Sequence, residues 1–332
     1  MRPPYNYANR IVMQKIDYSI IVPLYNGALT ISDCVEAILS SDIENYEIIV
    51  VDDCSTDNSA EHVPFHSQVS ILSHNRNKGP SAARNTGAKQ AKGDTLIFID
   101  SDTLVRPNTL SYLLKPLLDE PNLLGTNGIF AIDLPPTNRT SDFVNTSIHF
   151  QHIGHGKRVN TTFTAICALR RSAFLNMGGW DERRQSRYAD DINTRWQLPP
   201  KSLLLVTEAQ VVHKKNVSLL GMLKHRFNIG YHFVKSLDDN ASSAVKSPMK
   251  ATLHYRYPIN TAIGFGLLVG VICPPIWLPL LGIGAVNNAE FMLFTLRKRN
   301  LKEALISTPL SLAEGVAYAL GIIQGGHHRF RA

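Results

Sequence analysis

Two aspartates at the end of an apolar run are the first side chains in this 332-residue chain that suggest chemistry. Asp100 and Asp102 follow residues 96–99, a run of Leu, Ile and Phe that is typical of a buried strand. Two carboxylates one residue apart repel each other, and a hard divalent cation with oxygen ligands relieves that repulsion and could hold a diphosphate. Because Asp-x-Asp triplets are common by chance, the position of this one at a strand end is what gives it significance.

Two further acidic clusters accompany this pair. The segment DDCSTDNS at residues 52–59 contains Asp52 and Asp53, which can accept hydrogen bonds from a base or a ribose, although such clusters are also ordinary loop chemistry. Asp190 and Asp191 form the other cluster. A carboxylate there could serve as a general base, and the alternative is a helix N-terminus whose acidic residues suit the helix dipole.

Short β-branched runs alternate with helical patterns from Tyr18 onward. The predicted strands are residues 18–22, 47–51, 69–72 and 95–99. The predicted helices are residues 31–39, 80–91, 171–177 and 190–197. This alternation predicts an α/β fold in which helices cover both faces of a mostly parallel sheet. Such sheets bind ligands at the carboxyl ends of their strands, where the acidic clusters stand.

Composition excludes several classes of protein. With 44% hydrophobic and 18% charged residues, the chain can bury a core, which excludes general disorder, a fibrous repeat and a collagen. Its four scattered cysteines argue against a zinc site or a disulfide framework and fit a reducing cytosolic face. The absence of a GxGxxG or P-loop motif after the first strand argues against a dehydrogenase or a P-loop ATPase. The net charge of +7 suggests acidic partners, such as nucleic acid, nucleotide phosphates or an anionic membrane.

The C-terminal third changes in character. Residues 257–289 contain no charged side chain, and prolines interrupt this apolar stretch, so we predict a membrane hairpin of residues 259–273 and 276–296. Basic residues on both sides place both flanks in the cytoplasm. A central carboxylate, Glu314, costs about 2.5–3.5 kcal/mol to insert, so residues 304–323 are predicted to form an interfacial or re-entrant helix. The alternative for the whole region is a buried helical subdomain of a soluble protein.

Five motifs occur in a fixed order along the chain. VPLYN at residues 22–26 precedes DDCSTDNS, and then come NKGPSAARNTG at 77–87, FIDSD at 98–102, and GGWDE at 178–182 with Asp190 and Asp191. In this order the motifs resemble the family-2 inverting glycosyltransferases with a GT-A fold, over roughly residues 18–230. The resemblance implies a GT-A-like mixed, mostly parallel sheet flanked by helices, followed by a C-terminal helical membrane-associated region.

The resemblance also implies a role for individual residues. The implied nucleotide-binding residues are Pro23, Tyr25, Asn26, Asp52, Asp53, Asn77, Gly79, Arg84, Ser101, Lys214 and Arg226. The implied ligands of Mg²⁺ or Mn²⁺ are Asp100, Asp102 and His213, although a surface position is the alternative for His213. Asp191 would be the catalytic base, and Asp190 stands where the family more often has glutamate. A basic juxtamembrane face is the alternative for Arg226.

The expected activity is transfer of one sugar, with inversion, from a UDP-linked donor to a hydroxyl of a lipid-linked acceptor or a cell-surface polysaccharide precursor. We expect a location at the cell membrane, a catalytic domain on the cytoplasmic side, and no nucleic-acid partner. The expected parts are an N-terminal extension (1–16), a GT-A domain (17–230) and a juxtamembrane and membrane-associated helical region (231–332). The alternatives are a nucleotidyltransferase that releases pyrophosphate and a non-catalytic sugar-nucleotide-binding membrane scaffold.

Overall fold

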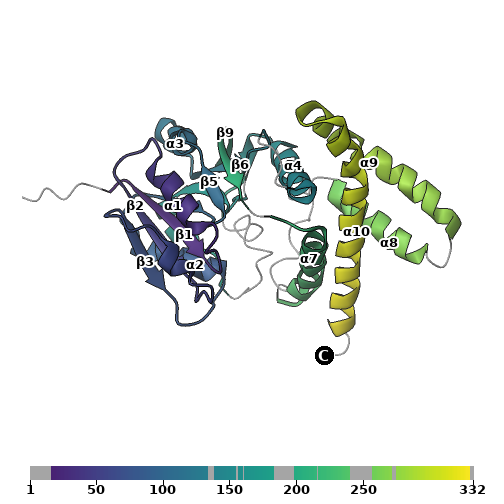
Figure 1. The fold of residues 1–332 in the computed structure, drawn as a ribbon, viewed down its shortest axis with the longest axis horizontal. Coiled ribbons are helices and arrows are strands. Elements are labelled where there is room, and N and C mark those ends of the chain that lie inside the picture. Colours follow the sequence, from purple (N-terminus) through teal and green to yellow (C-terminus); the bar gives the residue numbers. More distant parts are fainter. Residues whose placement is uncertain are drawn as a thin grey trace, which may run out of the picture.

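The computed structural model of the protein describes residues 16–133, 138–154, 156–159, 161–182, 198–214, 216–239, 256–270 and 274–329. Figure 1 shows a twisted sheet with helices packed around it, and a group of long helices beside it that come from the C-terminal third. The predicted catalytic aspartates, Asp190 and Asp191, and the helix predicted at residues 190–197 lie outside the described residues.

The N-terminal half of the sheet is parallel. Its strands are β1 (Tyr18–Leu24), β2 (Tyr46–Asp52), β3 (Val69–Ser73) and β4 (Thr95–Ile99), in the spatial order β3-β2-β1-β4. In the register, Tyr18 pairs with Tyr46 on one side and with Thr95 on the other, so the carboxyl ends of these strands share one edge. All four strands confirm the sequence prediction.

Helices cover both faces of these strands. On one face, α1 (Ile31–Leu39) buries Ile31, Val35 and Ile38 against the core. On the other face, α2 (Pro80–Gln90) presents small residues, and a Cβ at Gly87 would lie 2.5 Å from the side chain of Ile21. The small residues of the α2 segment therefore allow this helix to lie close to the strand.

The second half of the sheet is antiparallel in most of its pairings. After β4 come β8 (Ile166–Arg170), β6 (Gly125–Phe130), β9 (Leu203–His213) and β5 (Thr103–Val105), and β7 (Arg158–Val159) pairs with β9. β6 and β9 are parallel to each other, whereas β8 runs against both of its neighbours. Because β5 runs antiparallel to the end of β9, Thr103 pairs with His213, and the segment that follows β4 lies beside the end of β9.

Three further helices complete this part of the chain: α3 (Thr109–Asp119), α4 (Arg139–Gly154) and the short α5 (Arg171–Asn176). Helix α5 confirms the helix predicted at residues 171–177. It ends at Asn176, and Gly178 and Gly179 follow with φ angles of +77° and +75°, the left-handed conformation that glycine adopts after helices. In Figure 1, α4 lies between the sheet and the C-terminal helices.

The C-terminal helices are α7 (Leu219–Asp239), α8 (Arg256–Val269), α9 (Trp277–Lys298) and α10 (Leu301–Arg329). A short 3-10 turn, η4 (Pro274–Ile276), precedes α9, so α8 and α9 follow the predicted proline-broken hairpin. Helix α10 is longer than predicted, and residues 301–327 are apolar enough and long enough to cross a membrane.

Helix α10 packs directly on α7 (Figure 1). A Cβ at Gly321 would lie 2.0 Å from the backbone oxygen of Phe227, and one at Gly230 would lie 2.3 Å from that of Tyr318. Glycines therefore let the two helix backbones approach each other, as in many membrane helix pairs. Glu314, in the middle of α10, is 3% exposed and forms an ion pair with Arg226 of α7. Its carboxylate therefore faces a partner inside the protein.

Candidate active site

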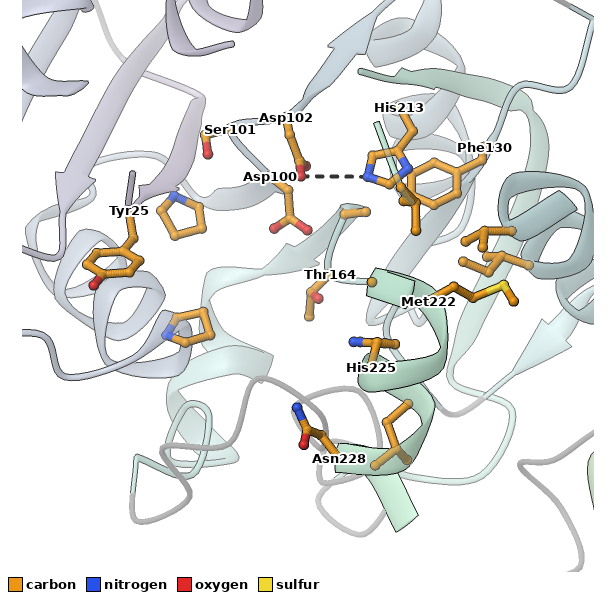
Figure 2. A pocket seen from close by; sticks show the side chains of 18 of the residues that line it. Tyr25, Asp100, Ser101, Asp102, Phe130, Thr164, His213, Met222, His225 and Asn228 are labelled. Atoms are coloured by element: carbon orange, nitrogen blue, oxygen red, sulfur yellow. Dashed lines mark ion pairs between the residues drawn. The ribbon is translucent and has the colours of Figure 1, made fainter. Parts of the chain in front are cut away.

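A single cavity of about 750 Å³ collects most of the predicted site residues. It lies at the carboxyl end of the parallel strands, where the switch in strand order opens a crevice. The predicted residues that line it are Pro23, Tyr25, Asp53, Asn77, Gly79, Arg84, Asp100, Ser101, Asp102, His213 and Arg226. Figure 2 shows Tyr25 at one side of this cavity and His225 and Asn228 of α7 at another.

The aspartate pair faces a histidine from the end of β9. The Nε2 atom of His213 lies 3.6 Å from Oδ2 of Asp102 (Figure 2). The backbone holds this arrangement, because the amide of Lys214 donates a hydrogen bond to the carbonyl oxygen of Asp102 at 2.8 Å. The ring of Phe130 stacks on the imidazole with 4.6 Å between centroids and an interplanar angle of 5°.

These residues fit a divalent cation held together with a substrate. Among the residues described, no group of three or more His, Cys, Asp or Glu side chains forms a metal site by itself. Mg²⁺ and its relatives, however, are commonly held by one or two carboxylates plus phosphate oxygens of the substrate. Asp102 and His213 supply an oxygen and a nitrogen at a separation that a small closure would bring onto one ion.

Arg84 places a fixed positive charge beside the aspartate pair. Its Nη2 atom donates a hydrogen bond to Oδ1 of Asp100 at 2.7 Å, and its guanidinium carbon lies 5.7 Å from the centre of the Trp180 ring. Burial raises the pKa of the Asp100 carboxyl above its ordinary value, with the guanidinium opposing the shift and Asp102 adding to it. Arg84 therefore orients Asp100, and its contact with a nucleotide stays a prediction.

Asp53 organises the loop that leads into α2. Its Oδ1 atom accepts hydrogen bonds from His74 Nδ1 at 2.7 Å and from the backbone amide of Lys78 at 2.8 Å. Its Oδ2 atom accepts one from the amide of Gly79 at 2.7 Å, and Gly79 has a φ of +92°. The carboxylate thus fixes residues 74–79 as one wall of the cavity. His74 was not predicted as a site residue, because an isolated histidine in a polar loop carries no signal in the sequence.

Three predicted nucleotide-binding residues do not line the cavity. Asn26 accepts a hydrogen bond from the backbone amide of Thr56 at 2.8 Å, and Asp52 accepts one from that of Ser55 at 3.2 Å. The Asn26 side chain therefore joins the loops that follow β1 and β2, whereas that of Asp52 binds within the loop after its own strand. Lys214 is exposed and forms an ion pair with Asp33 of α1 at 3.3 Å. Their contact with a nucleotide stays a prediction.

Sequence comparison decides the family of this region. Residues 19–178 match the family model described as glycosyl transferase family 2. The chain contains a family-2 glycosyltransferase domain. It is 39% identical over 107 residues to glycosyltransferase GlyG of Streptococcus pneumoniae, covering 31% of this chain and 35% of that protein. It is 36% identical over 101 residues to the succinoglycan biosynthesis protein ExoO of Rhizobium meliloti, covering 30% of this chain and 29% of that protein. The chain thus spans about a third of the length of these curated relatives.

A solved structure shares the fold of this chain. The mannosyltransferase PcManGT from Pyrobaculum calidifontis, in complex with GDP-Man and Mn²⁺, superposes with a TM-score of 0.58 over 90% of this chain and 88% of that one. At 19% sequence identity the likeness concerns the fold alone. It confirms the predicted GT-A-like fold, a mixed sheet flanked by helices.

The GGWDE motif at residues 178–182, which precedes the predicted base Asp191, is hydrogen-bonded to helix α2. Asn85 of α2 donates a hydrogen bond to the carbonyl oxygen of Trp180 and accepts one from its backbone amide, at 2.8 and 2.9 Å. The same side chain also donates to Glu182 at 2.8 Å. GGWDE is therefore fixed beside the helix that carries Arg84. The roles of Asp190 and Asp191 stay predictions.

The rest of the cavity wall comes from segments that no motif marks, among them α4, α7 and α10. Apolar side chains of Phe130, Val144, Ile148, Phe163 and Met222 line it, and α7 and α10 add Arg226 and Glu314. Figure 2 shows Met222 and Phe130 on the same side of the cavity. The Nε atom of Arg226 donates a hydrogen bond to Oε1 of Glu314 at 2.7 Å. The cavity thus combines the polar groups at the strand edge with a patch of apolar side chains and with the Arg226–Glu314 ion pair between α7 and α10.

Proposed function

We propose that this glycosyltransferase moves one sugar, with inversion, from a UDP-linked donor to a hydroxyl of a lipid-linked acceptor or polysaccharide precursor, with the help of Mg²⁺ or Mn²⁺. The observation that carries the proposal is the meeting of Asp100, Asp102 and His213 with the nucleotide-side residues in one cavity. A site that combines paired carboxylates with a fixed arginine suits a nucleoside diphosphate whose charge a cation shares.

The nucleotide would lie at the strand-edge end of the cavity. Tyr25 lines this end with Asp53, whose fixed carboxylate is suited to accept a hydrogen bond from the imide N–H of uracil. Relatives support a transferase in glycan synthesis, since one of them is named for succinoglycan biosynthesis.

The reaction would be a single displacement at the anomeric carbon. Asp191, the predicted base, would take the proton of the acceptor hydroxyl as that oxygen attacks, and Asp100 and Asp102 would hold the diphosphate end of the donor. When bound, the divalent ion would neutralise charge on the departing nucleoside diphosphate. One base without a carboxylate nucleophile implies inversion of configuration.

A product assay tests the proposed reaction. The full chain in detergent is incubated with Mn²⁺, radiolabelled nucleotide sugars and a membrane lipid extract as the source of acceptor, and in a parallel arm with UTP and sugar 1-phosphates. UDP, pyrophosphate and the anomeric configuration of the product are measured. We expect UDP release that Asp102→Ala and Asp191→Asn each reduce by at least about a hundredfold. The matched control is Asp119→Ala, an exposed aspartate at the end of α3. Release of pyrophosphate, or normal turnover in Asp102→Ala, would refute the proposal.

We also propose that the C-terminal helices attach the enzyme to a membrane. Their polarity is the reverse of that in a soluble protein, because amides lie inside and large apolar side chains lie outside. Asn260, Asn287 and Asn288 form a buried hydrogen-bonded cluster between α8 and α9, with distances of 2.9–3.1 Å. On the outer face of α9, Leu278 is 80% exposed and Val286 is 78% exposed. A hydrocarbon environment suits that outer face.

Vesicle flotation tests the attachment. We expect the wild-type chain to float with phosphatidylcholine–phosphatidylglycerol vesicles, and the pair Leu278→Asp and Val286→Asp to float less. The matched control is Leu118→Asp, because Leu118 is 69% exposed on α3 at the sheet. Equal flotation of all three proteins would refute this assignment of the membrane face.

The cytoplasmic side and the lipid-linked acceptor follow from the same helices. The basic residues Arg297, Lys298 and Lys302 stand at the junction of α9 and α10, as the positive-inside tendency expects of a cytoplasmic flank. Apolar side chains of α4 and α7 line the cavity beside these helices, which suits an acceptor delivered from the membrane. Appearance of the radiolabel only in water-soluble products would contradict a lipid-linked acceptor.

A further inference from the structure

We propose that Asn145 of α4 is a positioning residue that fixes the ring of His213 and the nitrogen it offers to the divalent cation. The inference rests on the proposed function, because it concerns the metal site of that reaction. No sequence motif marks Asn145. It reaches the site from α4, a helix that packs against β6 and β9.

The contacts of His213 hold its imidazole in one orientation. Its Nδ1 atom lies 2.9 Å from Oδ1 of Asn145, and the ring of Phe130 stacks flat against it at 4.6 Å. The hydrogen bond fixes rotation within the ring plane, and the stacking fixes the plane itself. The side chain is only 12% exposed, so water has little access to it.

The same contacts decide which ring nitrogen faces the aspartate pair. The amide oxygen of Asn145 can only accept a hydrogen bond, so Nδ1 is the nitrogen that donates to it. Nε2 is thereby turned toward Oδ2 of Asp102, at 3.6 Å. A divalent cation between these two atoms would be held by one nitrogen and one oxygen. In known metal sites, the second ring nitrogen of a ligating histidine commonly has such a partner.

The position of Asn145 depends on the C-terminal helices. Phe143 and Phe150 of α4 pack against Phe291 of α9, with ring centroids 6.0 and 5.2 Å apart. This apolar cluster fixes α4, and therefore places the amide of Asn145 against the end of β9. Helix α4 thus contributes Asn145 to the proposed metal site and is itself held in place by its packing against α9.

Mn²⁺ affinity tests this role independently of turnover. Binding is measured by electron paramagnetic resonance on the full chain in detergent, with UDP present, for Asn145→Leu, Asn145→Asp, His213→Ala, Asp102→Ala and the double variant with Asn145→Leu and His213→Ala. We expect Asn145→Leu to weaken Mn²⁺ binding by about 10–100-fold. Asn145→Asp keeps an acceptor oxygen for Nδ1 and should retain most of the affinity. Asn176→Leu, the same substitution at an exposed asparagine that ends α5, is the matched control.

The double variant separates positioning from general structure. If Asn145 acts through His213, adding Asn145→Leu to His213→Ala should cause no further loss of affinity. An equal loss in both backgrounds, or wild-type affinity in Asn145→Leu while Asp102→Ala loses binding, would overturn the role of Asn145 alone. Wild-type affinity in Asp102→Ala as well would instead overturn the proposed metal site. UDP binding without metal and circular dichroism verify that each variant is folded.

Discussion

Arg299 joins the C-terminal helices to the glycosyltransferase domain, and its removal is the perturbation with the clearest expected cost. The residue stands between α9 and α10, yet its side chain is only 7% exposed. Its guanidinium forms a two-point ion pair with Asp142 of α4, in which Nε lies 3.3 Å from Oδ2 and Nη2 contacts Oδ1. A third nitrogen, Nη1, donates to the carbonyl oxygen of Ile132, two residues after β6.

The expected cost follows from burial. Arg299→Met leaves a carboxylate that is 7% exposed without its cation, and breaking a buried pair from one side costs about 3–5 kcal/mol. Asp142→Leu should cost a similar amount, because it leaves the guanidinium uncompensated. The double variant replaces both charges with apolar groups, and a buried pair replaced in this way is often close to neutral. We therefore expect the double variant to be less destabilised than the sum of the single variants by at least about 2 kcal/mol.

Acidity should modulate this cost in a defined direction. Burial raises the pKa of Asp142 above its ordinary value, Arg299 opposes that shift, and Glu303 adds to it. A carboxyl whose pKa is raised by folding binds its proton more tightly in the folded state, so acidification through that range favours the folded form. Without Arg299 the pKa rises further. The deficit of Arg299→Met should therefore shrink as the pH falls, since a protonated Asp142 is no longer a buried charge.

Guanidinium denaturation of the full chain in detergent, followed by tryptophan fluorescence, measures the double-mutant cycle at several pH values. Arg297→Met is the matched control, because Arg297 is exposed two residues earlier on α9 and should change stability by less than about 0.5 kcal/mol. Strictly additive single variants, a control as damaging as Arg299→Met, or a deficit independent of pH would each refute the reasoning.

Three further perturbations have expected outcomes. Glu314→Leu should destabilise the enzyme in denaturation by about 3 kcal/mol, since it leaves the partly buried Arg226 without its partner, while Glu314→Gln should cost less. Burial lowers the pKa of His149, whose Nδ1 lies 2.7 Å from the carbonyl oxygen of Phe130, so wild-type stability should fall as the pH drops below 6.5, and His149→Phe should flatten that dependence. Gly321→Val should separate α7 from α10, which protease digestion would reveal as faster cleavage in α10.

The parallel half of the fold could be predicted because its signals are local. Runs such as residues 96–99 are buried on both faces, so they are apolar throughout. Strand β6 gave no such signal, because its sequence GTNGIF contains two glycines and two polar residues. Its neighbours explain this composition, since a Cβ at Gly128 would lie 2.4 Å from the backbone oxygen of Ala209. The neighbouring strand lies so close that only glycine fits at this position. The sequence of β6 alone does not indicate how close that strand lies.

In the site, too, residues with a local sequence signal could be predicted, and residues brought there by tertiary packing could not. The aspartate pair could be placed because ligands bind at the carboxyl ends of parallel strands, and the pair directly follows such an end. Asn145 and Glu314 could not be found in this way, because tertiary packing alone brings α4 and α10 to the cavity. The prediction for Asp53 was incomplete for a related reason: the backbone amides that bind it come from a loop whose path the sequence does not specify.

The C-terminal helices form part of the wall of the candidate active-site cavity. If they served only to anchor the enzyme, their contacts with the glycosyltransferase domain would be few and remote from the site. Instead α10 contributes Glu314 to the cavity wall, and Arg299 holds the segment after Phe130, whose ring stacks on His213. Any force that moves α9 and α10 relative to the sheet therefore acts on the same side chains that face Asp102. If the proposed attachment and transfer both hold, these contacts couple them, and insertion of α9 and α10 into a bilayer would act on the geometry of the cavity.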